Sequence, residues 1–198
     1  MKNEIQGFGY SEMYEWQETP QGVSRFGKFV KFNEHYPNKI KLYDGSGFIV
    51  GITTTNSLSD SDNPEEWHDK FIANEYGDLY LRKERLAVGQ KTYDQVKEIS
   101  YIQTRPWEHH IPIINNVFND KIKYVPRTAR QEWIRVNLLG KCIVEDNGKC
   151  IAGGWCKPNS SKIIATQGIA IPSTNKTDKN RYYVLERISE KTILILNK

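Results

Sequence analysis

The chain has 198 residues, enough for one sizeable core, and its 28 basic and 24 acidic side chains leave a net charge of +4. The basic residues form no concentrated stripe, which argues against nucleic-acid binding. No apolar run is long enough to span a bilayer, and residues 1–6 contain no apolar signal core. We therefore expect one domain over residues 1–198 that folds in a cytoplasm and binds neither nucleic acid nor a membrane.

The first informative segment, residues 9–16, has the sequence Gly-Tyr-Ser-Glu-Met-Tyr-Glu-Trp. A short helix over residues 10–17 would place Glu12 and Glu15 one turn apart. A carboxylate beside apolar rings has its charged form destabilised, which raises its pKa towards the range useful for acid–base catalysis. A surface helix with both glutamates on its wet face explains the same pattern. The aromatic and apolar neighbours predict that the segment lies against the core with Glu12 partly buried.

Two strands are predicted next. Residues 39–43 alternate between apolar and polar side chains, and residues 48–53 form a second strand-like run. The Asp44-Gly45 pair between them is a turn signal, so the two runs are expected to form a hairpin.

The clearest helix signal begins at Asn63, which can cap a helix that continues with Pro64 and two glutamates. Trp67, Phe71 and Ile72 would then share one face of that helix. Residues 94–99 form a weaker helix candidate.

The last third of the chain again predicts strands. Residues 142–144 and 150–151 flank Asn147-Gly148, which suits a type I′ hairpin turn. Residues 168–178 are predicted to form an exposed loop, and two strands follow over residues 182–188 and 192–196. The expected fold is mainly β with one or two short helices, a compact sandwich-like or barrel-like single domain. An α+β fold is the alternative.

Standard catalytic and metal-binding patterns are absent from the sequence. Cys142, Cys150 and Cys156 are odd in number and form no CxxC pair, so buried free thiols are expected instead of a disulfide framework or a zinc site. The sequence predicts neither a metal nor a cofactor.

Several segments, in order along the chain, resemble motifs of the intramolecular-chaperone autoproteolytic cleavage domain. This is a glutamic-type peptidase family from phage tailspikes and neck appendages. Residues 9–16 resemble its entry motif, [AS]DYAExFEW. Further matches occur at residues 48–53, 67–71, 74–77, 124–141, 146–150, 154–159 and 183–188. Because the matches keep their order and span nearly the whole chain, together they are fairly specific.

The resemblance implies a role in assembly. In this family, the C-terminal domain helps three chains fold into a β-helical spike and then cuts itself off just before the Asp of the entry motif. The Glu three residues after that Asp is catalytic. Transferred to this chain, the catalytic position is Glu12, with Glu15 as a candidate helper, and the cut falls between Phe8 and Gly9. Residues 1–8 would be a residual segment before the cut, and residues 9–198 the chaperone-like and cleavage-like domain.

One departure bears on the chemistry, because Gly9 replaces the family Asp and removes one of two carboxylates. Since only residues 1–8 precede the cut, the chain is either an excised or processed piece or a standalone relative. We expect self-cleavage, as a single-turnover endopeptidase, to be slow or absent, and Gly9→Asp to restore or accelerate it.

The resemblance, together with an aromatic content of 12%, predicts a homotrimer, because aromatic side chains anchor association interfaces. The expected function is that of a trimerisation and chaperone module in a virion, made in the host cytoplasm. Its partner would be an upstream β-helical spike or another virion protein. One alternative is a structural fibre head or capsid-associated protein without cleavage. The other is a receptor-binding or glycan-binding tip that uses Trp107 and Trp155.

Overall fold

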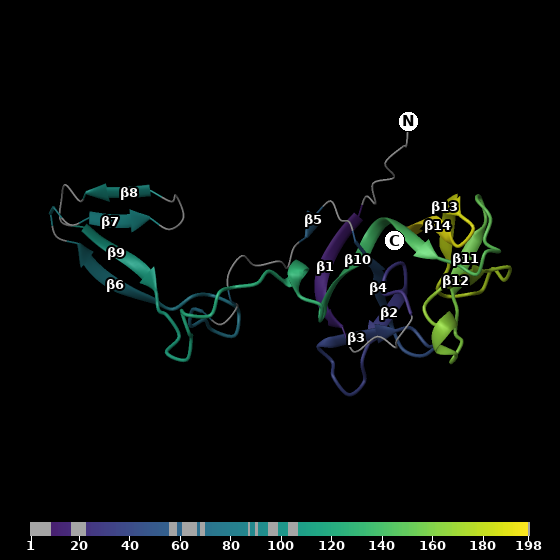
Figure 1. The fold of residues 1–198 in the computed structure, drawn as a ribbon, viewed down its shortest axis with the longest axis horizontal. Coiled ribbons are helices and arrows are strands. Elements are labelled where there is room, and N and C mark those ends of the chain that lie inside the picture. The colour runs from purple at the N-terminus through teal and green to yellow at the C-terminus, as the bar shows by residue number, and fades with distance from the viewer. Residues whose placement is uncertain are drawn as a thin grey trace. The chain divides into compact units, whose positions relative to one another are not determined.

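The structure is a computed structural model that describes residues 9–16, 23–55, 59–60, 67, 70–86, 88–89, 91–94, 99–102 and 107–197. Its elements are almost all strands, and the described residues contain only two short 3-10 helices (Figure 1). The mainly β prediction is therefore confirmed over the α+β alternative. The elements are β1 (Gly9–Trp16), β2 (Phe29–Phe32), β3 (Lys39–Leu42), β4 (Ile49–Thr54), β5 (Ser59–Asp60), β6 (Leu81–Leu86), β7 (Lys91–Asp94), β8 (Ile99–Ile102), β9 (Trp107–Pro112), η1 (Arg127–Ala129), β10 (Trp133–Glu145), β11 (Trp155–Pro158), η2 (Ile164–Thr166), β12 (Ala170–Pro172), β13 (Tyr182–Ser189) and β14 (Thr192–Asn197).

The chain divides into two compact units. The first, called here the barrel unit, comprises Met1–Asn63 and Val125–Lys198, and the second, the inserted unit, comprises Pro64–Tyr124. The expectation of a single domain over residues 1–198 stays a prediction.

Five strands of the barrel unit pair in a closed ring. β10 pairs with β4, β4 with β2, β2 with β3, β3 with β1, and β1 returns to β10. The parallel pairing between β1 and β3 joins two pairs of residues, fewer than any other pairing in the ring. The ring encloses an apolar cluster made of Trp16, Val30, Ile40, Leu42, Ile134 and Val136.

The C-terminal half of β10 belongs to a second part of the sheet. This 13-residue strand pairs with β1 and β4 in its first half and with β14 in its second. Gly140 lies between the two halves with a φ of 100°, a conformation that glycine adopts without strain. β14, β13, β11 and β12 then continue the sheet and enclose a second core cluster, which includes Phe29, Ile52, Val184 and Ile195.

The inserted unit holds two separate two-stranded sheets, β6 with β9 and β7 with β8. Beside them, Phe71 bridges to Ile114 and Ala73 to Leu79. The described residues 70–80 form bridges and a turn where the helix was predicted to continue, so that prediction is wrong there; its expected cap at Asn63 lies outside the described residues. Residues 95–98 of the weaker helix candidate also lie outside.

Both predicted hairpins are wrong in their pairing, although three of the strands exist. β3 and β4 do not pair with each other, because β2 lies between them and pairs with both. The residues directly after Asn147-Gly148 form no strand, and the partner of this part of β10 is β14. In the first case the preceding strand β2 takes the pairing, and in the second a strand distant in the sequence, β14, takes it.

The tail behaves as predicted, since β13 and β14 form an antiparallel pair. The expected exposed loop over residues 168–178 is only partly exposed: residues 168–170 are buried, and β12 pairs there with β11. Among the described residues, no helix is long and apolar enough to cross a membrane.

Candidate active site

Strand β1 carries the candidate catalytic residue. The helix considered for residues 10–17 is a strand as far as Trp16, while Gln17 lies outside the described residues. Its alternation explains why: Ser11 and Met13 are buried on one face, and the intervening residues point to the other. β10 supplies seven paired positions, which outweigh a local helical preference.

Glu12 lies on the inner face of the barrel. Tyr10, Glu12 and Tyr14 lie on the same face of β1 as Trp16, and Trp16 belongs to the barrel core. Opposite Glu12 in the ladder is the fully buried Val136. Glu12 itself is half-buried, as predicted from its aromatic and apolar neighbours.

Two tyrosines clamp this carboxylate. The Tyr10 hydroxyl donates to Oε1 of Glu12 and the Tyr14 hydroxyl donates to Oε2, both at 2.9 Å. The Tyr14 ring packs edge-on against Phe32, with centroids 5.8 Å apart. Each carboxylate oxygen therefore has a donor, and the packed Tyr14 ring fixes one of them in place.

Glu15 does not join Glu12. The two glutamates are three positions apart on a strand, so their side chains leave from opposite faces. Glu15 instead forms an ion pair with Lys39, its neighbour on β3. The structure thus places the candidate helper with Lys39 and away from the clamped carboxylate.

Gly9 follows the candidate cleavage point, while Phe8 lies outside the described residues. A Cβ atom on Gly9 would stand 1.8 Å from Nδ2 of Asn137 and 2.6 Å from the carbonyl oxygen of Leu139. Asn137 is buried, donates to that same carbonyl at 3.3 Å, and accepts from Nδ2 of Asn197 at 3.2 Å. The room for a side chain at position 9 is therefore filled by a fixed amide.

The family model described as Peptidase_G2, IMC autoproteolytic cleavage domain, matches residues 4–190. The chain belongs to this family. The pre-neck appendage protein of Bacillus phage B103 is 22% identical over 149 residues, which are 75% of this chain and 15% of that protein. The chain thus matches only a small part of that relative.

Two solved structures resemble this member of the cleavage-domain family. The pre-mature bacteriophage phi29 gene product 12 matches with a TM-score of 0.61 and 19% identity, over 96% of this chain and 21% of that one. The C-terminal fragment of the same gene product matches with a TM-score of 0.58 and 20% identity, over 96% of this chain and 99% of the fragment. At these identities the likeness shows a shared fold.

Two segments that resemble the cleavage-domain family meet in space. Arg187, from residues 183–188, donates to Oδ2 of Asp146 at 2.8 Å and to the carbonyl oxygen of Cys150 at 3.0 Å. Burial opposes ionisation of Asp146, but the hydrogen bonds from Arg187 and from the Cys150 amide hold its pKa below the usual value. This contact ties residues 146–150 to the end of β13.

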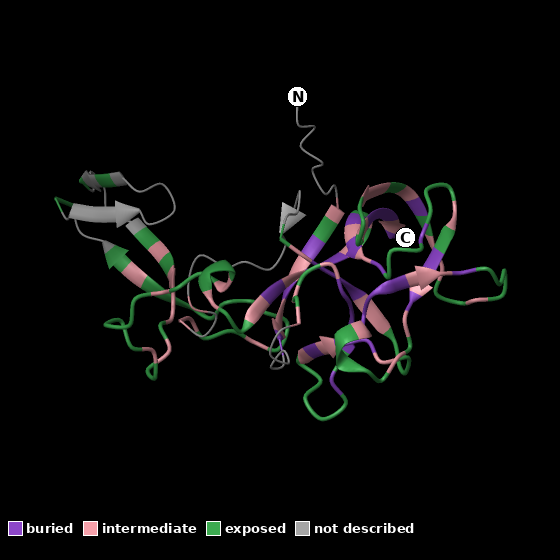
Figure 2. Ribbon diagram, turned by 45° about the vertical axis from the view of Figure 1, so that its right-hand side comes forward, coloured by how far each residue is buried: buried purple, intermediate pink, exposed green. Residues whose placement is uncertain are grey.

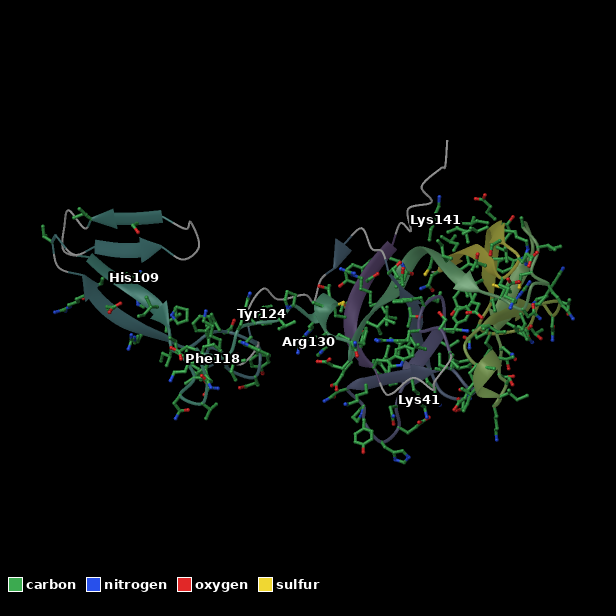
Figure 3. All side chains as sticks on the ribbon, viewed as in Figure 1. Lys41, His109, Phe118, Tyr124, Arg130 and Lys141 are labelled. Atoms are coloured by element: carbon green, nitrogen blue, oxygen red, sulfur yellow. The ribbon has the colours of Figure 1, made fainter. Side chains whose placement is uncertain are left out.

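The segment before β10 is fixed by cation–π contacts. The Arg127 guanidinium lies 4.0 Å from the centre of the Trp133 ring, and Arg130, labelled in Figure 3, lies 5.4 Å from it. A third arginine, Arg25, lies over Trp16 at 5.8 Å. Trp16 and Trp133 lie at the same end of the pairing between β1 and β10, so these contacts anchor that end of the ladder that carries Glu12.

The three cysteines are buried free thiols, as predicted. Burial raises the pKa of the Cys142 thiol to about 12, and the neighbouring Cys150 together with burial raises that of Cys156. Both thiols are therefore weak nucleophiles at neutral pH. Within the described ranges, no group of three or more acidic, His or Cys side chains could hold a metal ion.

The sequence alone did not reveal three residues of the site. Asn137 fills the space beside Gly9, Asn197 donates a hydrogen bond to Asn137, and the buried Ser11 hydroxyl has no hydrogen-bond partner among the described atoms. The alternation of Tyr10, Glu12 and Tyr14 could have revealed the clamp. An Asn between Val136 and Leu138 is a signal of a buried polar group, but nothing local connects it with Gly9.

Proposed function

We propose that this chain is the assembly module of a phage appendage, acting as an intramolecular chaperone that gathers three copies into a homotrimer in the virion. The observation that carries the proposal is the family match over residues 4–190. The names of the similar proteins, a pre-neck appendage protein and a pre-mature phage gene product, point the same way. The partner is an upstream β-helical spike or another virion protein. The proposal needs no nucleic acid, membrane, metal or cofactor.

The proposed cleavage is a hydrolysis of the Phe8–Gly9 peptide bond. Glu12 takes a proton from a water molecule, whose oxygen attacks the Phe8 carbonyl carbon. When the C–N bond breaks, the Gly9 nitrogen receives a proton and leaves as a free amine. Rapid hydrolysis by carboxylates uses a second positioned group to donate that proton, and Gly9 has no side chain to supply it. Losing one such group typically costs about 10²- to 10⁴-fold in rate.

The geometry of β1 favours cleavage between chains. Gly9 and Glu12 lie three residues apart, roughly 10 Å along an extended strand, and face opposite sides of it. A carboxylate at position 9 and that of Glu12 would therefore leave β1 on opposite faces. A neighbouring copy in a trimer can bring its own Glu12 to the Phe8–Gly9 bond.

The mass of the purified chain tests the chemistry. We expect the unaltered chain to remain intact for hours. Gly9→Asp alone should disturb β1, because its Cβ meets Asn137 and the Leu139 carbonyl, so the carboxylate is best introduced together with Asn137→Ala. That pair should accelerate cutting before residue 9, and Glu12→Gln added to it should stop the cutting. Rapid cleavage of the unaltered chain that survives Glu12→Gln would show that Glu12 is not the catalytic residue.

Mixing tests whether the cut acts between chains. A mass-tagged chain with Gly9→Asp, Asn137→Ala and Glu12→Gln is refolded together with chains that keep Glu12. The tagged chain should be cut in mixed assemblies and remain intact alone. Light scattering of the unaltered chain should give a particle of three 23.0 kDa chains, and a monomer at micromolar concentration would refute the homotrimer.

Of the alternatives, a structural role without cleavage is favoured by the filled space beside Gly9. The same mass measurement separates it from slow cleavage.

A glycan-binding tip has less support at Trp155, because the Arg181 guanidinium covers that ring at 4.5 Å and Tyr183 packs edge-on against it. The side chain of Trp107 lies outside the described ones.

A further inference from the structure

The inserted unit shows no buried core among the residues whose exposure is described. Neither core cluster of the molecule contains any of its residues, and no residue from 64 to 124 whose exposure is described is buried. Figure 2 shows the described part of this unit without any buried position, in contrast to the barrel unit. His109, Phe118 and Tyr124, labelled in Figure 3, are three of its half-buried residues.

Large apolar side chains are nevertheless frequent in this unit, and they face outward. Ten of those that the structure describes are exposed: Ile72, Tyr76, Leu79, Tyr80, Leu81, Val88, Ile102, Ile114, Val117 and Ile122. Single exposed apolar residues are normal, but here the described apolar side chains are exposed or half-buried and none is buried, so they contribute little of the hydrophobic free energy that holds a fold together.

The strand pairing in the inserted unit also provides little stability. Its described strands form only two-stranded sheets, and an isolated two-stranded sheet is at best marginally stable in water. The outer edge of a two-stranded sheet is also a place where another strand can add its backbone hydrogen bonds. Among its described residues, the unit has neither a covering layer nor a third strand in either sheet.

The charge of the unit identifies another copy of this chain as the partner that fits best. Residues 64–124 carry nine basic and ten acidic side chains, so like copies do not repel one another. The signs also alternate across the sheet, where Arg85 pairs with Glu108 at 3.0 Å and Lys83 lies 3.9 Å from the same carboxylate. Strand edges that are identical in every copy can pair around a rotation axis and close the assembly.

We propose that the inserted unit is the principal contact between copies of this chain, and that it completes its packing only when copies associate. The inference rests on the homotrimer of the proposed function and names the part of the chain that forms it. Folding of this unit and assembly are then one event, while the barrel unit folds within each chain.

Paired substitutions at highly exposed positions test the interface. Tyr76 and Val117 of the inserted unit are 83% and 79% exposed, and Phe48 and Ile151 of the barrel unit are 76% and 71% exposed. Replacing either pair with Asp should leave a lone chain undisturbed. We expect Tyr76→Asp with Val117→Asp to weaken association by about thirty-fold or more, the effect of losing one interface hot spot, and the Phe48→Asp with Ile151→Asp control to leave it unchanged.

Hydrogen exchange at several dilutions gives a second readout and checks that each variant folds. Amides of β6 and β9 should be protected only at concentrations where the chain is associated, whereas those of β10 and β14 should stay protected throughout. The inference is overturned if a trimer forms equally well in both variants, or if β6 and β9 are as protected as β10 in dilute monomer. A chain that never associates would instead refute the homotrimer itself, and the inference with it.

Discussion

The barrel unit and the inserted unit both form β-strands, but their strands differ in how many partners they have and in how far their side chains are buried. In the barrel unit, β10 is shared by two core clusters, and most strands have partners on both sides. In the inserted unit, the described strands pair only two by two, and their apolar side chains remain exposed. The difference teaches that strand propensity alone does not stabilise a sheet; further strands or a covering layer must bury its apolar face.

The largest expected contrast comes from matched core and surface truncations. Ile52→Ala removes a fully buried side chain of the barrel unit and should lower the free energy of unfolding by about 2–5 kcal/mol. Ile114→Ala, at an exposed position of the inserted unit, should change it by less than about 0.5 kcal/mol in dilute monomer. Urea unfolding followed by tryptophan fluorescence measures both. Equal costs in the monomer would contradict the distinction between the two units.

A side chain added at Gly9 should lower the free energy of unfolding by somewhat less than Ile52→Ala does. Gly9→Ala forces a Cβ against Asn137 and the Leu139 carbonyl, and overpacking of this kind costs about 1–3 kcal/mol. Asn137→Ala should recover part of that loss. Gly77 of the inserted unit is the control: its φ is 88° and no atom lies within 4 Å of its would-be Cβ, so Gly77→Ala is costly through its backbone alone. Asn137→Ala should therefore give no rescue of Gly77→Ala in thermal unfolding.

Acid should weaken the barrel unit through Asp44. Partial burial opposes ionisation of this carboxyl, but hydrogen bonds from the buried Lys31 and from Ser46 lower its pKa to about 2. Because the folded pKa lies below the ordinary value near 4, the stabilisation is complete above about pH 4 and is lost as the pH falls towards 2. It amounts to about 2 kcal/mol at most. Asp44→Asn should flatten the dependence of the free energy of unfolding on pH in this window.

The smallest effects concern the clamp on Glu12. Tyr14→Phe keeps the packed ring and removes one donor, so it should cost about 1 kcal/mol. Tyr10→Phe should cost less, because the Tyr10 hydrogen bond is exposed to water. Tyr76→Phe in the inserted unit should change nothing. If the Tyr10 and Tyr14 variants unfold at the same temperature as the unaltered chain, the clamp contributes no stability.

Local patterns in the sequence were sufficient for the mainly β class, for β13 and β14, and for the placement of Glu12 against an apolar surface. Alternating side chains and turn residues report on a strand and its immediate neighbour, and the ordered motifs identified the family. The buried cysteines followed from their number and spacing. All of these signals lie within short segments of the chain.

Tertiary structure decided the rest. Residues 10–16 form a strand because β10, more than a hundred residues away, offers a paired edge. β2 separates β3 from β4 because strand order depends on how the ring closes, which no hairpin signal records. The sequence alone showed that position 9 lacks a carboxylate, and only the fold showed that Asn137 fills the space. The physical reason is that such contacts join residues distant along the chain, whereas a sequence pattern reports only on neighbours.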